Sequence, residues 1–294
     1  MSFFLQPATL AEAVQALAET RGVVLSGGTD FFPARVDRPI TETVIDISRV
    51  RELKEISVEA DRIVIGGRTT WSEIASVALP RGFDGLKSAA REIGGIQIQN
   101  FGTVAGNLCN ASPAADSVPP LLTLDAEVRL ASASGTRTLP LGDFILGNRK
   151  TARRADEILT SVAVPRRLEN AASSFLKLGA RRYLVISIVM VAVTILNDKW
   201  NAQINGEGNC VAEARVAVGS CSAQSRRLPR LEESLVGAAA RPGLGKLATA
   251  DYLDALSPID DVRGTAAYRR DASITLVQRA IDACVAAPSS ASGV

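Results

Sequence analysis

The chain has 294 residues, of which 47% are hydrophobic, and its 33 Lys and Arg residues nearly balance its 31 Asp and Glu residues. This composition is typical of a globular protein with one large or two smaller domains, and it offers no basic block of the kind that binds nucleic acid. Because the sequence contains no histidine, it excludes histidine-dependent catalytic pairs, histidine metal ligands and a flavin attached through histidine.

The four cysteines, Cys109, Cys210, Cys221 and Cys284, show no C-x-x-C spacing. We therefore expect no metal site and no iron–sulfur cluster in this chain. The first residues lack the charged and apolar regions of a secretory signal, and the longest apolar run, residues 184–196, is shorter than the roughly 20 residues of a membrane span. These features predict a cytoplasmic protein without a membrane span.

The amino-terminal residues predict a small β-α-β unit over residues 1–55. Thr9 can cap a helix that starts at Leu10 and ends before Gly22, and residues 23–25 and 44–47 read as strands. The first strand runs directly into Ser26-Gly27-Gly28-Thr29-Asp30-Phe31, a Gly-Gly turn followed by a hydroxyl and a carboxylate.

The next residues predict a hairpin and two helices. The hairpin joins residues 56–58 to 62–67, one helix runs from Thr69 or Thr70 to Val77, and the other covers residues 86–93. The pair Gly66-Gly67 reads either as a ligand contact or as a strand-to-helix turn that needs glycine for its geometry.

Residues 102–116, Gly-Thr-Val-Ala-Gly-Asn-Leu-Cys-Asn-Ala-Ser-Pro-Ala-Ala-Asp, are unlike ordinary core or surface sequence. Gly102 and Gly106 permit close backbone approach, and short hydroxyl and amide side chains surround them. The stretch predicts a loop that cradles phosphates, with an ordinary polar surface loop as the alternative. It contains neither G-x-G-x-x-G nor the G-K-S/T of a P-loop, so a dinucleotide bound here needs a fold other than the Rossmann fold.

The remaining pattern predicts a domain boundary near residues 166–172. Before it we expect a short helix at 119–124, a hairpin of 126–131 with 137–141, and a strand at 158–164 that Pro165 ends. After it we expect a buried strand within 184–196 that pairs with 211–219, then helices at 226–237, 246–256 and 264–286 and a frayed tail, residues 288–294.

Several stretches together resemble the FAD-binding subunit of molybdenum hydroxylases, such as the medium subunit of carbon monoxide dehydrogenase or the flavin domain of xanthine dehydrogenase. They are residues 26–30, 102–116, 147–151, 156–159 and 175–182, in the family's order. The resemblance spans nearly the whole chain. One departure is Ala105, where the family usually has glycine, so its methyl group restricts backbone approach to a pyrophosphate.

The resemblance implies an α+β fold in three parts. These are a two-subdomain FAD-binding domain of the vanillyl-alcohol-oxidase-like type (1–168, with subdomains 1–55 and 56–168), an antiparallel sheet covered by helices (169–287), and the tail. It also implies noncovalent FAD, bound by Leu25, Ser26, Gly27, Gly28, Thr29, Asp30, Phe31, Thr103, Ala105, Gly106, Asn107, Asn110, Ser112, Asp116, Leu159 and Lys177, with Ile93 near the adenine.

Two of these residues have other readings. Asp116 can accept a hydrogen bond from a ribose hydroxyl or cap the helix that follows Ser117. Lys177 can stabilise the reduced flavin with its positive charge, or it can be an ordinary solvated lysine. No acid–base pair is expected, because the flavin itself carries the redox chemistry.

The resemblance implies an oxidoreductase subunit that takes electrons from a small subunit with [2Fe–2S] clusters and passes them to a small-molecule acceptor. A large molybdopterin subunit would oxidise the substrate, and the complex would be a dimer of heterotrimers. Two alternatives remain open at this point: a self-contained flavin oxidoreductase, and a cofactor-free assembly protein with the same fold.

Overall fold

The computed structural model describes residues 3–36, 38–198 and 209–286. Backbone contacts divide the chain into two compact units whose segments alternate in sequence. Unit 1 comprises Met1–Val77, Ile93–Ser112 and Asp125–Arg166, and unit 2 comprises Ala78–Glu92, Pro113–Leu124 and Arg167–Val294. The division into domains 1–168 and 169–287 stays a prediction, because compactness does not show which segments fold independently. The predicted tail, 288–294, lies outside the described residues.

The first sheet of unit 1 is parallel, in the order β1-β3-β2. Its strands are β1 (Phe4–Leu5), β2 (Val23–Leu25) and β3 (Val44–Asp46). Helix α1 (Leu10–Thr20) starts at a capping box between Thr9 and Glu12, and its buried face packs against Ile45 and Ile47. The structure has the β-α-β unit that the sequence predicts and adds β1.

The second sheet of unit 1 is antiparallel, in the order β4-β5-β10-β6-β7. Its strands are β4 (Ile56–Val58), β5 (Arg62–Gly66), β6 (Glu127–Ser132), β7 (Gly135–Pro140) and β10 (Ile158–Pro165). Both predicted hairpins are present, and β10 lies between them. A short antiparallel pair, β8 (Ile145–Gly147) and β9 (Lys150–Thr151), completes the strands described in this unit.

Short helices connect these strands. They are α2 (Trp71–Ser76), α4 (Ile96–Phe101), α5 (Val104–Asn110) and α7 (Leu141–Phe144), with the 3-10 turns η1 (Pro33–Arg35), η2 (Ile47–Arg49) and η3 (Arg51–Leu53). The prediction of an irregular loop at 102–116 is wrong for its first half. The Thr103 hydroxyl caps α5 by accepting from the Gly106 N–H, which offsets the low helix propensity of glycine and asparagine.

The sheet of unit 2 is antiparallel, in the order β11-β12-β13-β14. Its strands are β11 (Ala172–Leu178), β12 (Val189–Asp198), β13 (Cys210–Gly219) and β14 (Arg226–Arg227). The side chains of β12 alternate between two cores: Val191 and Val193 belong to one cluster, and Met190 and Ala192 to the other. Burial on both faces explains why β12 is a continuous apolar run.

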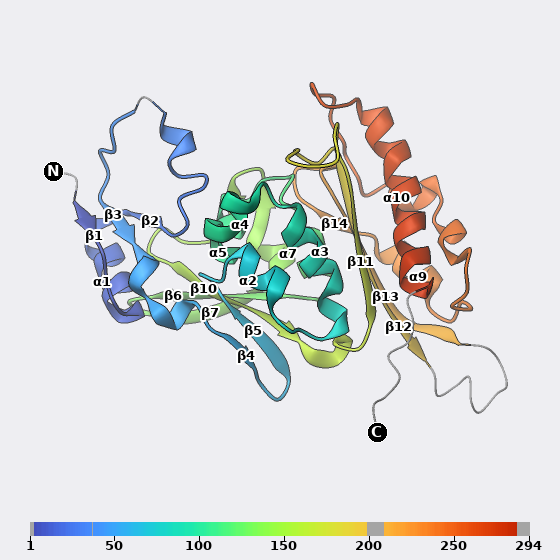
Figure 1. Ribbon diagram of the computed structural model, residues 1–294, viewed down its shortest axis with the longest axis horizontal. Helices are drawn as coiled ribbons and strands as arrows, with labels where there is room; N and C mark the ends of the chain where they lie inside the picture. Colours follow the sequence, from blue (N-terminus) through green and yellow to red (C-terminus); the bar gives the residue numbers. More distant parts are fainter. Residues whose placement is uncertain (1–2, 37, 199–208, 287–294) are drawn as a thin grey trace. The chain divides into compact units, whose positions relative to one another are not determined.

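Helices cover both faces of this sheet (Figure 1). They are α3 (Asp84–Glu92), α6 (Val118–Thr123), α9 (Pro229–Leu235) and α10 (Ala266–Ala286). The 3-10 turns are η4 (Arg81–Phe83), η5 (Arg166–Leu168), η6 (Leu244–Leu247) and η7 (Ala250–Leu253). Ala89 of α3 packs against the Met190 side of the sheet, whereas Val277 and Ile281 of α10 pack against the other.

Two predicted helices of unit 2 are wrong in part. Residues 226–227 form the edge strand β14, and Pro229 opens the shorter helix α9. The segment 246–256 is split into η6 and η7, because Thr249 between them has an extended backbone. The predicted strand begins at Val189, so residues 184–188 form its approach.

Candidate functional site

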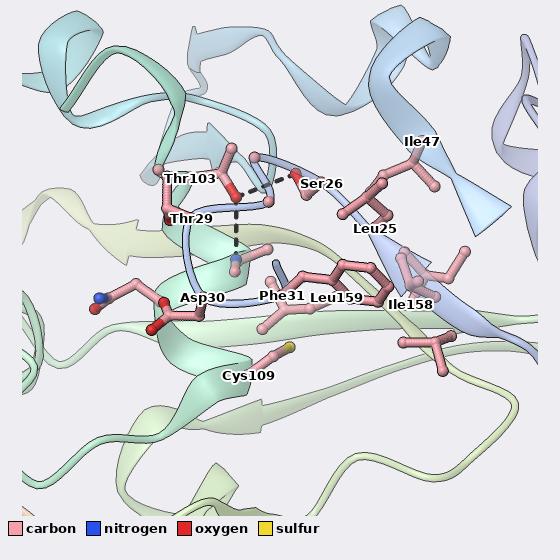
Figure 2. Close-up of a pocket in the computed structure, with 18 of the residues that line it drawn as sticks. Leu25, Ser26, Thr29, Asp30, Phe31, Ile47, Thr103, Cys109, Ile158 and Leu159 are labelled. Atoms are coloured by element: carbon pink, nitrogen blue, oxygen red, sulfur yellow. Dashed lines mark hydrogen bonds between the residues drawn. The ribbon is translucent and has the colours of Figure 1, made fainter. Parts of the chain in front are cut away.

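The Gly-Gly turn after β2 and the start of α5 meet in unit 1 (Figure 2). The hydroxyl oxygens of Ser26 and Thr103 are 3.1 Å apart, and the Thr103 oxygen also accepts from the Gly106 N–H at 3.1 Å. A Cβ on Gly27 would lie 1.8 Å from the carbonyl oxygen of Phe101. The two turns therefore touch only because residue 27 has no side chain.

A cavity of about 330 Å³ lies at this junction. Twelve of the residues that the sequence assigns to FAD line it: Leu25, Ser26, Gly27, Gly28, Thr29, Asp30, Phe31, Thr103, Ala105, Gly106, Asn107 and Leu159. The other four, Asn110, Ser112, Asp116 and Lys177, do not belong to its lining. The volume lies at the lower end of ordinary ligand pockets.

The Gly-Gly turn offers backbone donors to this cavity. Among the described residues, no atom accepts a hydrogen bond from the N–H groups of Gly27, Gly28 or Thr29. Gly28 has φ +73°, in the left-handed region, and a turn of this kind can present successive N–H groups to one anion.

The start of α5 differs from the anion-binding turn that the sequence predicts there. The Val104 N–H donates to Thr69 O, that of Ala105 to Gly67 O, and that of Asn107 to Thr103 O. The first two donors hold α5 against the segment after β5, and the third bond lies within α5 and its cap. Gly67 allows the same close packing, since a Cβ there would lie 2.7 Å from Leu159 O. Neither Gly66 nor Gly67 lines the cavity.

Charged residues border one part of the cavity. Arg153 and Glu157 line it, and the Arg153 guanidinium donates to Glu157 O at 2.7 Å. The Glu157 carboxylate accepts two bonds from Arg137, of 2.5 and 2.8 Å, and one from the Arg154 N–H. The hydrogen bond from Arg137 lowers the pKa of Glu157, so this carboxylate is ionised and already paired.

Asp116 and Lys177 form a buried ion pair in unit 2. Their side chains are 7% and 6% exposed, and Nζ of Lys177 lies 2.6 Å from Oδ2 of Asp116. Lys177 also donates to Glu92 O, and the Ser187 hydroxyl donates to Oδ1 of Asp116. Burial raises the pKa of Asp116, against the opposing effects of Lys177 and Ser187.

This ion pair excludes one of the two readings given for each residue, the solvated lysine for Lys177 and the helix cap for Asp116. Lys177 is not solvated, and the Asp116 carboxylate binds Lys177 and Ser187, while no side chain caps α6. Asn110 lies elsewhere, in unit 1, where its amide oxygen accepts from Arg149. Ser112 follows α5 and is half-buried.

Two family models match the chain. The model described as "FAD binding domain in molybdopterin dehydrogenase" matches residues 1–167, and the model described as "CO dehydrogenase flavoprotein C-terminal domain" matches residues 174–284. The chain belongs to the family of FAD-binding subunits of molybdenum hydroxylases. This identification confirms the resemblance found in the sequence, and it makes the chain an oxidoreductase subunit.

Individual relatives of this flavoprotein subunit agree with the assignment. The chain is 36% identical over 243 residues to the nicotinate dehydrogenase FAD-subunit of Eubacterium barkeri, covering 80% of this chain and 79% of the relative. It is 28% identical over 285 residues to a putative xanthine dehydrogenase FAD-binding subunit of Escherichia coli, covering 95% and 94%.

A solved structure shares its fold. In carbon monoxide dehydrogenase from Hydrogenophaga pseudoflava, a chain that is 26% identical superposes with a TM-score of 0.85, and the match covers 96% of both chains. The α+β class and the order of an FAD-binding domain followed by a carboxy-terminal domain are thereby confirmed.

The lining of this cavity offers chemistry that parts of a flavin nucleotide require. The three N–H groups of residues 27–29 match the need of a pyrophosphate for donors. Apolar side chains such as Leu25, Ile47 and Ile158 offer surface to a flat ring.

Sequence reasoning missed several residues that line this cavity, namely Ile47, Trp71, Ile98, Cys109 and Arg153. Ile93, assigned through the resemblance alone, does line it. The sequence around the apolar residues of this group does not distinguish them from core residues. Trp71, for example, is only 1% exposed.

Within 3–36, 38–198 and 209–286, no three or more Cys, Asp or Glu side chains are grouped as metal ligands would be. No helix in the same ranges has both the length and the apolar character needed to cross a bilayer.

Proposed function

We propose that the unit 1 cavity holds the pyrophosphate of noncovalently bound FAD and that the turn of Ser26, Gly27, Gly28 and Thr29 supplies its main donors. The observation that carries this proposal is the set of backbone N–H groups at Gly27, Gly28 and Thr29, which have no acceptor within the described chain. The N–H groups of Val104, Ala105 and Asn107 are already used, so Thr103 and its neighbours support the turn.

The remaining assignments follow the family resemblance residue by residue. Leu25, Asp30, Phe31 and Leu159 would contact other parts of FAD from the same cavity, and Asn110, Ser112, Asp116 and Lys177 remain proposed ligands. Because Lys177 is paired with Asp116, their opposite charges largely cancel.

We further propose that the subunit accepts electrons from the [2Fe–2S] clusters of a partner small subunit and passes them to a small-molecule acceptor. FAD, when bound, supplies the capacity to store and release electrons. Substrate oxidation would belong to a molybdopterin-containing large subunit. The names of the two relatives support one part of this division, a separate subunit for FAD, since one is called an FAD-subunit and the other a putative FAD-binding subunit of a dehydrogenase.

Replacement of Gly28 by alanine tests whether the cavity holds the pyrophosphate of FAD. Gly28 has φ +73°, and a Cβ there would lie 2.8 Å from the Phe32 ring. We expect Gly28→Ala to weaken FAD binding about tenfold or more, equivalent to about 1.4 kcal/mol. Quenching of flavin fluorescence during titration of the flavin-free chain gives the Kd.

Gly237→Ala is the matched control. Gly237 has φ +81°, nothing lies within 4 Å of a Cβ built on it, and it does not line the cavity. It carries similar backbone strain and should leave the Kd for FAD unchanged. Equal losses of affinity in both variants, or none in Gly28→Ala, would contradict the proposed position of the pyrophosphate.

A further inference from the structure

The chain folds back on itself directly after the Gly-Gly turn. The N–H of Phe32 donates to Gly28 O at 3.2 Å, and the N–H of Ala34 donates to Asp30 O at 3.1 Å. The Phe32 ring lies over Gly28, since a Cβ on that glycine would be 2.8 Å from Cε2 of the ring. Residues 31–35, which we call the η1 segment, therefore pack on the turn that carries the free donors.

The hydrogen bond to Gly28 O fixes the direction of one donor. In a planar trans peptide, the C=O of one residue and the N–H of the next point in opposite directions. Because Gly28 O faces the N–H of Phe32, the N–H of Thr29 points away from the η1 segment. Thr29 lines the cavity, and its N–H has no acceptor within the described chain. The η1 segment thus determines where one of the three free donors points.

Arg35 holds the η1 segment in place. Its Nη1 donates to Phe31 O at 3.1 Å, and its Cζ lies 3.8 Å from the centre of the Phe31 ring. Phe31 O and the Phe32 N–H belong to the same peptide unit, so Arg35 binds the unit that donates to Gly28 O. Phe31 lines the cavity and Arg35 does not, so the arginine acts through this peptide.

Glu42 in turn holds Arg35. Nη2 of Arg35 donates to Oε1 of Glu42 at 2.6 Å. This hydrogen bond lowers the pKa of Glu42 to about 2, so the carboxylate is charged at neutral pH. Glu42 lies just before β3, which pairs with β2, the strand that runs into the Gly-Gly turn. Arg35 therefore links the η1 segment to the sheet that carries the turn.

Stability alone does not account for these contacts. The side chains of Arg35 and Glu42 are 24% and 35% exposed, and ion pairs near the surface stabilise a fold little. Phe32 is 55% exposed, so its ring adds little buried apolar area. What the contacts provide is a fixed direction for one peptide unit beside the cavity.

We propose that Arg35 is a positioning residue that aims the Thr29 N–H into the unit 1 cavity, toward the pyrophosphate of the bound nucleotide. The identity of this ligand rests on the proposed function. The direction of the donor rests on the contacts of Arg35 and Phe32 alone.

The first measurement needs no flavin. In the flavin-free full-length chain, hydrogen exchange followed by NMR gives the rate for the Phe32 N–H. Arg35→Met removes the donors while keeping an apolar stem, and it should raise that rate at least about fivefold by local opening. Arg35→Lys keeps the charge without the fork and should give an intermediate rate. An unchanged rate in Arg35→Met overturns the proposal.

Arg230→Met is the matched control. Arg230 also lies over a ring, with its Cζ 5.9 Å from the centre of Tyr252, donates to Asp251 O and pairs with Asp254. None of these contacts involves residues 26–42, and Arg230 does not line the cavity. The control should leave the exchange of Phe32 and the affinity for FAD unchanged. Equal acceleration in both variants would mean general loosening and would also overturn the proposal.

The second measurement is the Kd for FAD in a double-mutant cycle. Arg35→Met should weaken FAD binding about fivefold, and Glu42→Gln about twofold. In the Arg35→Met background, Glu42→Gln should add no further loss, because Glu42 acts only through Arg35. Additive losses, or no loss in Arg35→Met, would refute this route.

The third measurement compares two donors of the same turn at saturating FAD. FAD should slow the exchange of the Gly27 and Thr29 N–H groups in the natural chain. Arg35→Met should then raise the Thr29 rate at least about fivefold and leave the Gly27 rate unchanged, because the Ser26–Gly27 peptide makes no hydrogen bond to residues 31–35. A purely structural role would change both rates, so equal changes would count against the proposal.

These measurements separate the positioning role from the proposed function. If FAD leaves the exchange of Thr29 unchanged in the natural chain, the proposed position of the pyrophosphate fails, and with it the ligand assigned to this donor. The Phe32 rate then still decides whether Arg35 holds the η1 segment on the turn.

Discussion

Ala105 stands where the family usually has glycine, and its surroundings in unit 1 accommodate the methyl group. Its N–H donates to Gly67 O at 2.8 Å, and its Cβ would lie 3.0 Å from a Cβ on Gly67. The absence of a side chain at Gly67 thus makes room for the one at Ala105. Ala105 is therefore packed against Gly67, and the free donors lie in the other turn.

Ala105→Gly should consequently leave FAD affinity within about twofold of the natural chain, since no donor to the cavity changes. It should lower the free energy of unfolding by at most about 1 kcal/mol, through the entropy of glycine in a helix. Flavin titration and urea denaturation measure the two effects. A clear gain in affinity would show that the methyl group obstructs the pyrophosphate after all.

The ion pair of Arg137 and Glu157 joins strand β7 to the segment that leads into β10. The Glu157 side chain is 4% exposed, and its two oxygens accept from Nε and Nη2 of one guanidinium. Its folded-state pKa is lowered, so the carboxylate stabilises the fold above its ordinary pKa of about 4.3 and loses that contribution as pH falls through the folded value.

Glu157→Gln should destabilise the chain by about 1–3 kcal/mol at neutral pH, since it removes a charged acceptor from a buried group. The difference from the natural chain should shrink as the pH drops below about 4.3. Urea denaturation over a series of pH values tests this. A difference that does not depend on pH would show that the charge of Glu157 contributes nothing.

An exposed pair provides the control. Arg230 and Asp254 lie 3.8 Å apart, with side chains 70% and 75% exposed. Asp254→Asn should change stability little at any pH, because solvent screens such pairs.

At the scale of elements, the sequence predicts the helices and hairpins that adjacent residues encode. It does not predict those that depend on contacts with distant parts of the chain. The capping box at Thr9 and the hairpin of β6 and β7 are encoded in adjacent residues. Helix α5 is short and contains Gly106, so its existence depends on the Thr103 cap and on acceptors at Gly67 and Thr69 that lie far back in the sequence.

In the candidate site too, the sequence predicts what adjacent residues encode and not the contacts between distant residues. Residues 25–31 were predicted because strand and turn are contiguous. The pairing of Asp116 with Lys177 joins residues 61 apart and could not be inferred from either position. The burial of Arg269 could not be predicted either, because an arginine in an amphipathic helix is expected to face solvent.

For the whole molecule, the proposal predicts a chain that works within a complex. A tagged full-length chain purified from its native cells should bring with it iron, molybdenum and FAD, each measurable in the same sample. Its predicted location in the cytoplasm can be checked in the same fractionation. A dimer of heterotrimers should appear as a two-to-one mass relation between the complex and one set of subunits.

Two other outcomes correspond to the alternatives. A chain that purifies alone with FAD and turns over a substrate would be a self-contained oxidoreductase. A chain that purifies alone, is colourless and does not bind added FAD would fit an assembly protein, and either result would refute the proposed division of labour.

The contact between Gly27 and the Phe101 carbonyl sets a limit on how the molecule can evolve. Position 105, by contrast, accommodates a methyl group, which packs against Gly67. Only glycine fits at position 27, since the Cβ of every other amino acid would force apart two peptide segments that are in contact. A library of variants selected for flavin retention should therefore be depleted of all substitutions at this codon.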